Sequence, residues 1–469
     1  MSEATEAGQP GTASVQRPGT ELADSAGEAD PTDEHAVPVR AEGISLCGRY
    51  EGAGYAEPRY LLSRADGQMV LVSELLYRVT EQIDGQRTLR QIAERITADC
   101  GKQLSVPGVE YLINDKLHEL GVATLAEPVA KAPRADPLIA LAMRGVLLPA
   151  RFVRPLAAVL APLFQPALVV AVLCALVIVD VALVSSGALD PAFHRAVGDP
   201  AQVLTVMALV ITSTLFHETG HAAACRYGGA RPGSIGVGIL LVIPAFYTNV
   251  TDAYRLDRAG RLRTDLGGLY FNAIFILGAA GLFWATHFPP LMVFIVLSHI
   301  QMLQQLLPLI RLDGYYILGD LVGVPNLFAH VRPFLQRLAG KHRLAGQPAG
   351  GALRPRVRMI VTAWVMVVVP VLGLAMVSLL VRVPRYLETA LTRGRSFWDA
   401  GVAGLGQGQT LAGVLAIVSL VVVLLPWLGA TAFLLRTGRK VFLWHRRKHP
   451  KHQPRHRAQL AHRGAAKTP

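Results

Sequence analysis

Two histidines and a glutamate lie close together at the end of an uncharged stretch of the sequence. His217, Glu218 and His221 belong to the segment TSTLFHETGHAAACRYGG, which follows the apolar run AQVLTVMALVI. Residues four apart in an α-helix project from one face, so both histidines can bind one metal ion. The glutamate beside them can polarise a metal-bound water. The spacing therefore predicts a metal centre with hydrolytic chemistry on one helix, and zinc is the metal expected there.

The alternative is a pair of histidines that only make hydrogen bonds within a membrane helix. Ionisable side chains are costly inside a bilayer, so a His, a Glu and a second His together need a functional reason. This favours the metal interpretation. Cys225 lies one turn past His221 and could line the site, but a small buried helix residue is the simpler interpretation.

A catalytic zinc site also needs a third protein ligand and an open position for water. Asp313 lies in the segment LLPLIRLDGYYILGDLVGVPN, two apolar spans after His221, and offers a carboxylate. Because two crossings return the chain to the side from which it started, both residues are expected at the same membrane face. Pro308 and Gly314 bracket Asp313 and allow the helix to break there. The placement requires residues 233–250, GSIGVGILLVIPAFYTNV, to be a re-entrant hairpin or strand and not a span.

The elements that must position these residues are strongly apolar. The chain has 469 residues, of which 52% are hydrophobic and only 17% are charged. A membrane-spanning helix needs about 20 apolar residues, and six stretches approach this length. They are residues 164–186, 202–216, 266–286, 289–310, 358–381 and 410–435. The sequence therefore predicts an α-helical polytopic membrane protein with about six spans.

Basic residues set the predicted orientation. Three arginines lie within residues 144–154, before the first span, whereas the loop 187–200 holds only Arg195. Basic residues prefer the cytoplasmic side, so both termini are expected to be cytoplasmic in the plasma membrane. The Ala-, Arg- and Val-rich composition suggests a bacterium with a high GC content. The predicted outer loop 382–395 departs from the pattern because it carries four arginines.

Residues 45–126 form the candidate soluble domain, after an acidic segment, 1–44, with the composition of a disordered tail. YLLSRADGQMVLVS predicts a β-hairpin with an Asp-Gly turn, and Ser73 is the expected N-cap of the first of three short helices. The last of these helices ends at Gly121. These elements predict a small winged-helix-like α+β domain that is not basic enough to indicate DNA binding.

Composition predicts the remaining boundaries. A linker is expected at 127–155, a membrane core with four spans at 156–325, a cytoplasmic connection at 326–357, the last two spans at 358–435 and a basic cytoplasmic tail at 436–469. A basic segment directly after a span is typical of contact with anionic lipid, so no nucleic-acid partner is expected. The four cysteines form no CxxC pair and predict neither a disulfide framework nor a thiolate metal site.

Polar residues follow one face of the fourth predicted span. Ser298, Gln301 and Gln305 recur at helical spacing, with His299 and Gln304 nearby. Such residues in a span face protein or water, so they predict either a wet path to the metal or contacts between helices. Asp180 in the first span has no explanation in the sequence.

HETGH in a membrane span, with LDG after two further spans, resembles the site-2 protease class of intramembrane zinc metallopeptidases, the M50 family. The resemblance covers residues 200–325. It implies one zinc ion per chain, bound by the two histidines of HETGH and the LDG aspartate. The glutamate of HETGH is then the general base. Carried over, these residues are His217, His221, Asp313 and Glu218.

The same resemblance implies a substrate-binding role for Asn272 in GGLYFNAIF, for which a hydrogen bond between helices is the alternative. Two features depart from the family pattern. The usual Asn-Pro-x-Pro stretch appears only as LLPLIRLDG, and Tyr315 replaces the Gly that follows LDG. These departures question whether signal-anchor segments are the substrates.

The N-terminal domain resembles PqqD-like peptide-recognition domains. The resemblance rests on a hydrophobic-Ser-xx-hydrophobic-Tyr helix, an IDG-x-RT turn and a late L-x-x-LG helix. Together with LDGYYILGD, it makes the chain similar to the peptide zinc metalloproteases found beside clusters for ribosomally made peptides. This resemblance implies a role in the maturation or export of such a peptide.

The expected function is therefore hydrolysis of a peptide bond by a membrane-embedded zinc endopeptidase. Its partners would be the lipid bilayer, a peptide or membrane-protein substrate, and other proteins of peptide biosynthesis or export. The alternative is a non-enzymatic membrane scaffold or exporter subunit that binds a peptide through its N-terminal domain. The presence of all four residues proposed for the zinc site favours the enzyme.

Overall fold

The computed structural model describes residues 34–65, 69–101, 103–125, 142–186, 200–240, 243–338 and 352–424, with a few isolated positions beyond them. The predicted acidic tail up to residue 33, most of the basic tail and the loop 187–199 lie outside the described residues. The chain divides into two compact units. The first unit holds residues up to 41 together with 78–132, and the second holds 42–77 and everything after 132.

The first unit is a small helical body with a two-stranded sheet. Helix α2, Leu89–Cys100, begins at a capping box in which Thr88 accepts a hydrogen bond from the amide of Gln91. Helix α3, Val106–Tyr111, continues into the π-helix η1, Leu112–Leu117. Strands β1, Val39–Arg40, and β5, Ala123–Thr124, pair antiparallel. Its fully buried apolar side chains include Ile92, Ile96, Val109, Ile113 and Leu117.

The second unit begins with a three-stranded antiparallel sheet in the order β2-β3-β4. These strands are Ser45–Arg49, Arg59–Ser63 and Met69–Ser73. The hairpin expected from the sequence is β3–β4, although its Asp-Gly turn lies outside the described residues. Strand β2 was not expected. Helix α1, Glu74–Gln82, follows directly, and Ser73 Oγ accepts a hydrogen bond from the amide of Leu76 as the predicted N-cap.

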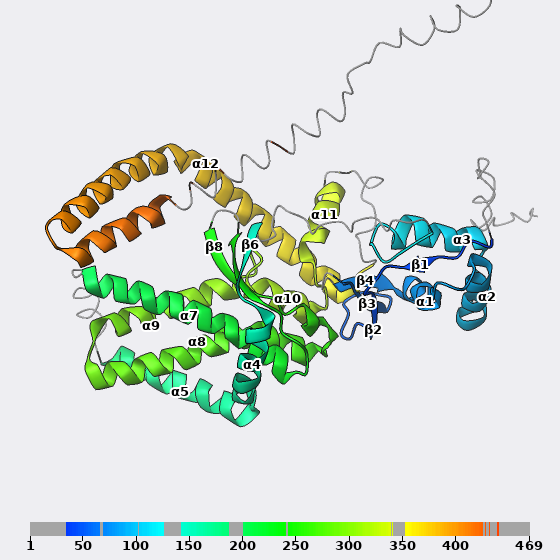
Figure 1. Cartoon of the computed structure of the whole chain (residues 1–469), viewed down its shortest axis with the longest axis horizontal. Coiled ribbons are helices and arrows are strands. Elements are labelled where there is room, and N and C mark those ends of the chain that lie inside the picture. The colour runs from blue at the N-terminus through cyan, green and yellow to red at the C-terminus, as the bar shows by residue number, and fades with distance from the viewer. Residues whose placement is uncertain are drawn as a thin grey trace, which may run out of the picture. The chain divides into compact units, whose positions relative to one another are not determined.

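Long apolar helices make up most of the second unit. The helices α7, α8 and α9 contact one another, and α5 packs against α8 (Figure 1). The main helices are α4 (Ala150–Leu160), α5 (Pro166–Ser185), α7 (Pro200–Tyr227), α8 (Arg258–Thr286), α9 (Pro289–Leu306), α10 (Asp313–Val322), α11 (Val331–Leu338) and α12 (Pro355–Gly406).

Four helices of the described residues are long and apolar enough to cross a membrane. They are α5, α7, α8 and the first part of α12, Pro355–Ser378. The protein is therefore membrane-associated, and these helices coincide with four of the six predicted spans. Helix α9 covers most of the fourth predicted span, and Thr410–Leu424 is a shorter apolar helix within the last.

The predicted loop at residues 382–395 is wrong, because these residues are helical. They belong to α12, which runs without interruption for 52 residues and contains Pro370 and Pro384. The loop was expected because these residues lie between two apolar stretches, but arginine is a good helix former and a helix can continue through them.

A second three-stranded sheet lies against α7 in the order β6-β7-β8 (Figure 1). Residues 233–250 form the hairpin of β7, Ile235–Leu240, and β8, Ile243–Thr248, and are not a span. Strand β6, Ala142–Leu148, comes from the segment that the sequence assigned to a linker. Strand β8 lies at one edge of this sheet.

Helices α7 and α8 approach each other closely at two glycines. A Cβ atom added to Gly220 would lie 2.3 Å from the carbonyl oxygen of Gly267, and one added to Gly267 would lie 2.6 Å from that of Gly220. Small residues at a helix crossing allow this backbone contact. The crossing lies within the HETGH segment and brings its histidines onto the surface of α8.

Candidate metal centre

Two helices bring three potential metal ligands together. His217 and His221 lie on α7, and their Nε2 atoms are 3.1 Å apart. Asp313 is the first residue of α10, and its Oδ2 and Oδ1 atoms lie 3.2 Å from His217 Nε2 and 3.5 Å from His221 Nε2. Each residue offers one ligand atom, and these atoms all lie within 4.8 Å of one another. The residues that the sequence selected by spacing and parity therefore form one cluster.

The geometry of this cluster fits a zinc ion. Nitrogen and oxygen ligands bound at about 2.0–2.2 Å in a tetrahedron lie about 3.3 Å from one another. The separation of 3.1 Å between the two Nε2 atoms agrees with that spacing, and Asp313 places one carboxylate oxygen 3.2 Å from His217 and the other 3.5 Å from His221. Asp313 Oδ2 is buried and has no hydrogen-bond partner among the described residues, although His217 lies beside it. A buried carboxylate oxygen in this position favours a cation beside it.

The ring orientation of His221 is fixed by α8. His221 Nδ1 lies 2.8 Å from the carbonyl oxygen of Thr264, which can only accept a hydrogen bond. The proton is therefore on Nδ1, and Nε2 presents its lone pair to the cluster. A carbonyl partner of this kind is the usual support of a histidine that binds a metal.

Gly268 makes room for both imidazole rings. A Cβ atom at this position would lie 2.4 Å from His217 Nε2 and 2.5 Å from His221 Nε2. No side chain larger than hydrogen fits without displacing the ligand atoms. Thr264 and Gly268 are four residues apart on α8, so one face of this helix both orients and accommodates the histidines.

The sequence around Asp313 places its carboxylate at the start of α10. A Cβ atom at Gly314 would lie 2.1 Å from the carbonyl oxygen of Leu306, so the glycine permits α10 to begin against the end of α9. Trp364 of α12 donates a hydrogen bond from Nε1 to the carbonyl oxygen of Pro308, at 2.7 Å. Tyr315 is buried and stacks on Phe328.

The ionisation of Asp313 suits a ligand. Burial raises the pKa of its carboxyl, but the neighbouring His221 and His217 outweigh burial and lower the pKa below its usual range. The carboxylate is therefore the form expected at neutral pH.

Glu218 is buried beside the cluster and contacts the edge strand β8. Thr248, the last residue of β8, has its Oγ1 atom 2.6 Å from Glu218 Oε2 and 2.9 Å from the Glu218 carbonyl oxygen. A hydroxyl carries one proton, so it donates to one of these acceptors at a time. The carboxylate that the sequence selected as general base is therefore held by the end of an exposed-edge strand.

Asn272 lies on α8 one turn beyond Gly268 and is buried. Its Nδ2 atom donates a hydrogen bond to Gln305 Oε1 of α9, at 3.4 Å. This contact is the inter-helix hydrogen bond that was the alternative to a substrate-binding role.

Two further polar residues of α9 have partners on neighbouring helices, whereas the buried hydroxyl of Ser298 has no hydrogen-bond partner among the described residues. Gln301 of α9 donates to Thr214 of α7 at 3.4 Å, and His299 Nε2 lies 3.2 Å from Asp180 Oδ2 of α5. The second contact accounts for Asp180. Cys225 is fully buried among apolar side chains such as Ala230 and Ala253, so its role is packing.

Sequence reasoning missed Thr248, which contacts Glu218, and the ion pair of Arg261 and Asp320 on α8 and α10. Thr248 had no motif to mark it. Arg261 and Asp320 are charged residues in apolar helices, which is a signal that can be read from the sequence. The structure pairs them, with Arg261 Nε 2.9 Å from Asp320 Oδ1.

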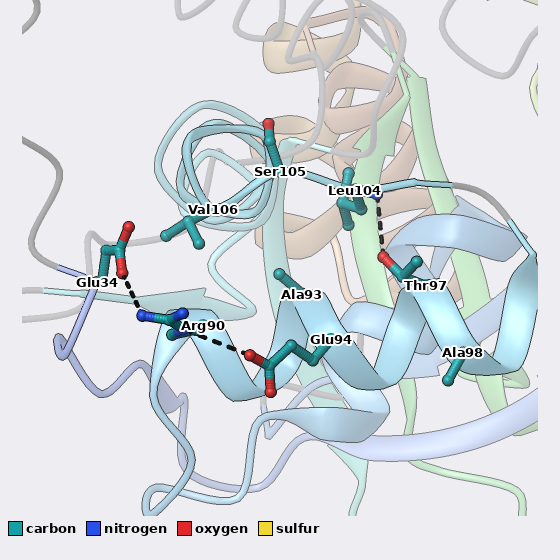
Figure 2. Close-up of a pocket in the computed structure, with 9 residues that line it drawn as sticks. All are labelled: Glu34, Arg90, Ala93, Glu94, Thr97, Ala98, Leu104, Ser105 and Val106. Carbon is teal, nitrogen blue, oxygen red and sulfur yellow. Dashed lines mark hydrogen bonds and ion pairs between the residues drawn. The ribbon is translucent and has the colours of Figure 1, made fainter.

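A second candidate site lies in the first unit, as a hollow of about 490 Å³ between α2 and the start of α3 (Figure 2). Ala93, Leu104 and Val106 supply apolar lining. Arg90 lies at its rim, 3.1 Å from Glu34 and 3.3 Å from Glu94, so its charge is already compensated. The hollow has the character of a small binding surface and not of a catalytic centre.

No protein-family model and no solved structure matches the chain. Over 118 residues the chain is 28% identical to a protein of Bacillus subtilis (strain 168) named "Putative peptide zinc metalloprotease protein YydH". The match covers 24% of this chain and 46% of that protein, so the chain aligns with less than half of the relative's length. This likeness supports a distant relationship to a zinc metalloprotease.

Proposed function

We propose that the protein is a membrane-embedded zinc endopeptidase of the site-2 protease-like M50 type. The observation that carries the proposal is the cluster of His217, His221 and Asp313, with separations that fit zinc, beside the buried carboxylate of Glu218. Three protein ligands leave a fourth position for water or substrate, as in catalytic zinc sites. The likeness to the B. subtilis protein points to the same chemistry.

Several residues of the chain have separate roles in the proposed reaction. Bound zinc supplies a Lewis acid for the peptide carbonyl and lowers the pKa of a water. Glu218 accepts the proton of the attacking water and returns it to the leaving amine. Thr248 holds the Glu218 carboxylate, and the Thr264 carbonyl keeps His221 in the tautomer that binds metal.

The edge strand β8 offers a place for an extended substrate. Within the described residues β8 pairs with β7 on one side only, and its last residue contacts Glu218. A peptide that adds to this edge would gain main-chain hydrogen bonds and reach the catalytic carboxylate. A helical membrane substrate must unwind before cleavage, and strand addition stabilises the unwound form.

We further propose that the substrate is a ribosomally made peptide, matured or exported with the help of other biosynthetic proteins. Residues 45–126 would act as a PqqD-like recognition domain, in which the hollow beside α2 is the surface available to a peptide segment. The core would sit in a bacterial plasma membrane with six spans and cytoplasmic termini, so that the metal centre opens to the cytoplasm.

The test is cleavage of a proteome-derived peptide library by the detergent-purified full chain, with new peptide termini identified by mass spectrometry. We expect new termini from the parent protein, none from Glu218→Gln, and none after chelation of zinc. Equal termini from parent and Glu218→Gln would assign the cleavage to a contaminant. Absence of cleavage, together with retained peptide binding by the first unit, would favour the scaffold function.

A further inference from the structure

Helix α10 carries two aspartates on one face. Asp313 and Asp320 are seven residues apart, which is close to two helical turns; Asp313 contacts the histidines of α7 and Asp320 contacts Arg261 of α8. On α8, Arg261 and Gly268 have the same spacing. Arg261 contacts Asp320, and Gly268 accommodates the histidines that contact Asp313. Asp320 therefore lies against Arg261 of α8, and Asp313 lies against the histidines that Gly268 of α8 accommodates.

Arg261 and Tyr50 both donate to Asp320, and the buried carboxyl of Asp265 also contacts it. Arg261 donates from Nε to Asp320 Oδ1 at 2.9 Å, and the hydroxyl of Tyr50 donates to the same oxygen at 3.1 Å. Tyr50 comes from the loop after β2, and its ring lies 4.3 Å from the Arg261 guanidinium carbon. Arg261 and Tyr50 are each 1% exposed and Asp320 is 8% exposed. Burial, followed by Asp320, raises the pKa of Tyr50, so its hydroxyl remains a donor.

Main-chain contacts join the same loop to the end of α10. The amide of Gly54 donates to the carbonyl oxygen of Gly323 at 2.9 Å, and Arg261 donates to the carbonyl oxygen of Glu51 at 2.9 Å. A Cβ atom on Gly54 would lie 2.2 Å from the carbonyl oxygen of Val322, so the backbones are in direct contact. The loop and the C-terminal end of α10 form one packed body.

The opposite end of α10 has weaker local support. The helix has only 10 residues, and its N-cap, Leu312, makes no side-chain hydrogen bond. Short helices are marginal in isolation, so tertiary contacts must set the position of this one. We propose that Tyr50, Arg261 and Asp320, the α10 clamp, are positioning residues that fix the depth and rotation of α10 and thereby direct Asp313 at His217 and His221.

The α10 clamp deepens the proposed function and rests on it, because the ion at the cluster is taken to be zinc. It makes a residue of the loop after β2 part of the support of a membrane metal centre. Supporting contacts beyond the ligands contribute about 10–100-fold to metal affinity. Loss of the Tyr50 hydroxyl should therefore weaken zinc binding without removing a ligand.

The test measures zinc affinity of the detergent-purified full chain by competition with a chromophoric chelator. Tyr50→Phe keeps the ring over Arg261 and removes only the hydroxyl. Tyr60→Phe is the matched control, because Tyr60 lies in the same sheet and its hydroxyl contacts the exposed Glu74 at 3.3 Å. We expect Tyr50→Phe to weaken zinc binding about 3–10-fold and Asp320→Asn about 10–100-fold, with Tyr60→Phe unchanged.

The absorption spectrum of the cobalt-loaded protein is a second measurement, which a purely structural role of Tyr50 would leave unchanged. We expect the d–d absorption of the cobalt-loaded protein to shift in Tyr50→Phe and not in Tyr60→Phe. If Asp320→Asn does not fold, Tyr50→Phe carries the test alone. Parent-like zinc affinity and cobalt spectrum in a folded Tyr50→Phe variant would overturn the α10 clamp and leave the proposed function standing. A parent protein that binds no zinc would overturn both.

Discussion

Thr248 lies with its Oγ1 atom 2.6 Å from Oε2 of Glu218, so the last residue of an edge strand holds the carboxylate at the metal cluster. In the proposed mechanism this contact would join substrate binding to proton transfer, because a peptide added to β8 would lie against the strand that orients Glu218.

Replacement of Thr248 should reduce turnover more than substrate binding. General-base catalysis contributes about 10²–10⁴-fold to a rate, and a misoriented carboxylate loses part of this. We expect Thr248→Val to lower kcat about tenfold with little change in KM, and Thr248→Ser to retain most of the activity, because Ser keeps the hydroxyl. The measurement is steady-state kinetics on a peptide selected from the library. Equal kcat values for Thr248→Val and the parent would show that the contact has no catalytic role.

Gly268→Ala should abolish strong zinc binding. Its methyl group would meet His217 and His221 ligand atoms at 2.4 and 2.5 Å, so the rings must move. Gly278→Ala is the matched control, since it lies on the same helix and its added Cβ meets nothing within 4 Å. We expect Gly268→Ala to bind zinc at least about tenfold more weakly and Gly278→Ala to match the parent in chelator competition. An unchanged affinity in Gly268→Ala would contradict the observed ring positions.

His330 should make the protein sensitive to acid. Burial lowers the pKa of His330 below its usual value of about 6.5. Below about pH 6.5 the unfolded chain therefore binds more protons at this residue than the folded chain. The free energy of unfolding therefore decreases as the pH decreases. We expect the parent to lose more thermal stability than His330→Gln between pH 7.5 and pH 5.5. Thermal unfolding in detergent measures this, and identical losses in both proteins would remove His330 as the cause.

The two histidine ligands could be predicted from their spacing in the sequence. The third ligand, Asp313, could be predicted from the expected topology. His217 and His221 follow from one helical turn, and Asp313 follows from counting spans, provided that residues 233–250 do not cross the membrane. The hairpin β7–β8 meets that condition. Its glycines and Pro244 were sufficient to argue against a helix.

Contacts between distant segments could not be predicted in the same way. Nothing in the sequence near Tyr50 indicates that its hydroxyl reaches Asp320, because the contact depends on how a loop packs against the end of α10. The contact of Thr248 with Glu218 likewise depends on where β8 ends. The loop at 382–395 was expected because it separates two apolar stretches, and hydropathy alone does not show that one helix continues through it.

The measurement that tests the central claim most directly is the zinc content per chain of the detergent-purified protein. We expect about one zinc ion in the parent and in Glu218→Gln, because Glu218 is not a ligand, and almost none in His217→Ala or Asp313→Ala. This pattern would establish a site built from α7 and α10 with Glu218 outside the ligand set. A parent protein without zinc, or an Asp313→Ala variant that keeps it, would contradict the account.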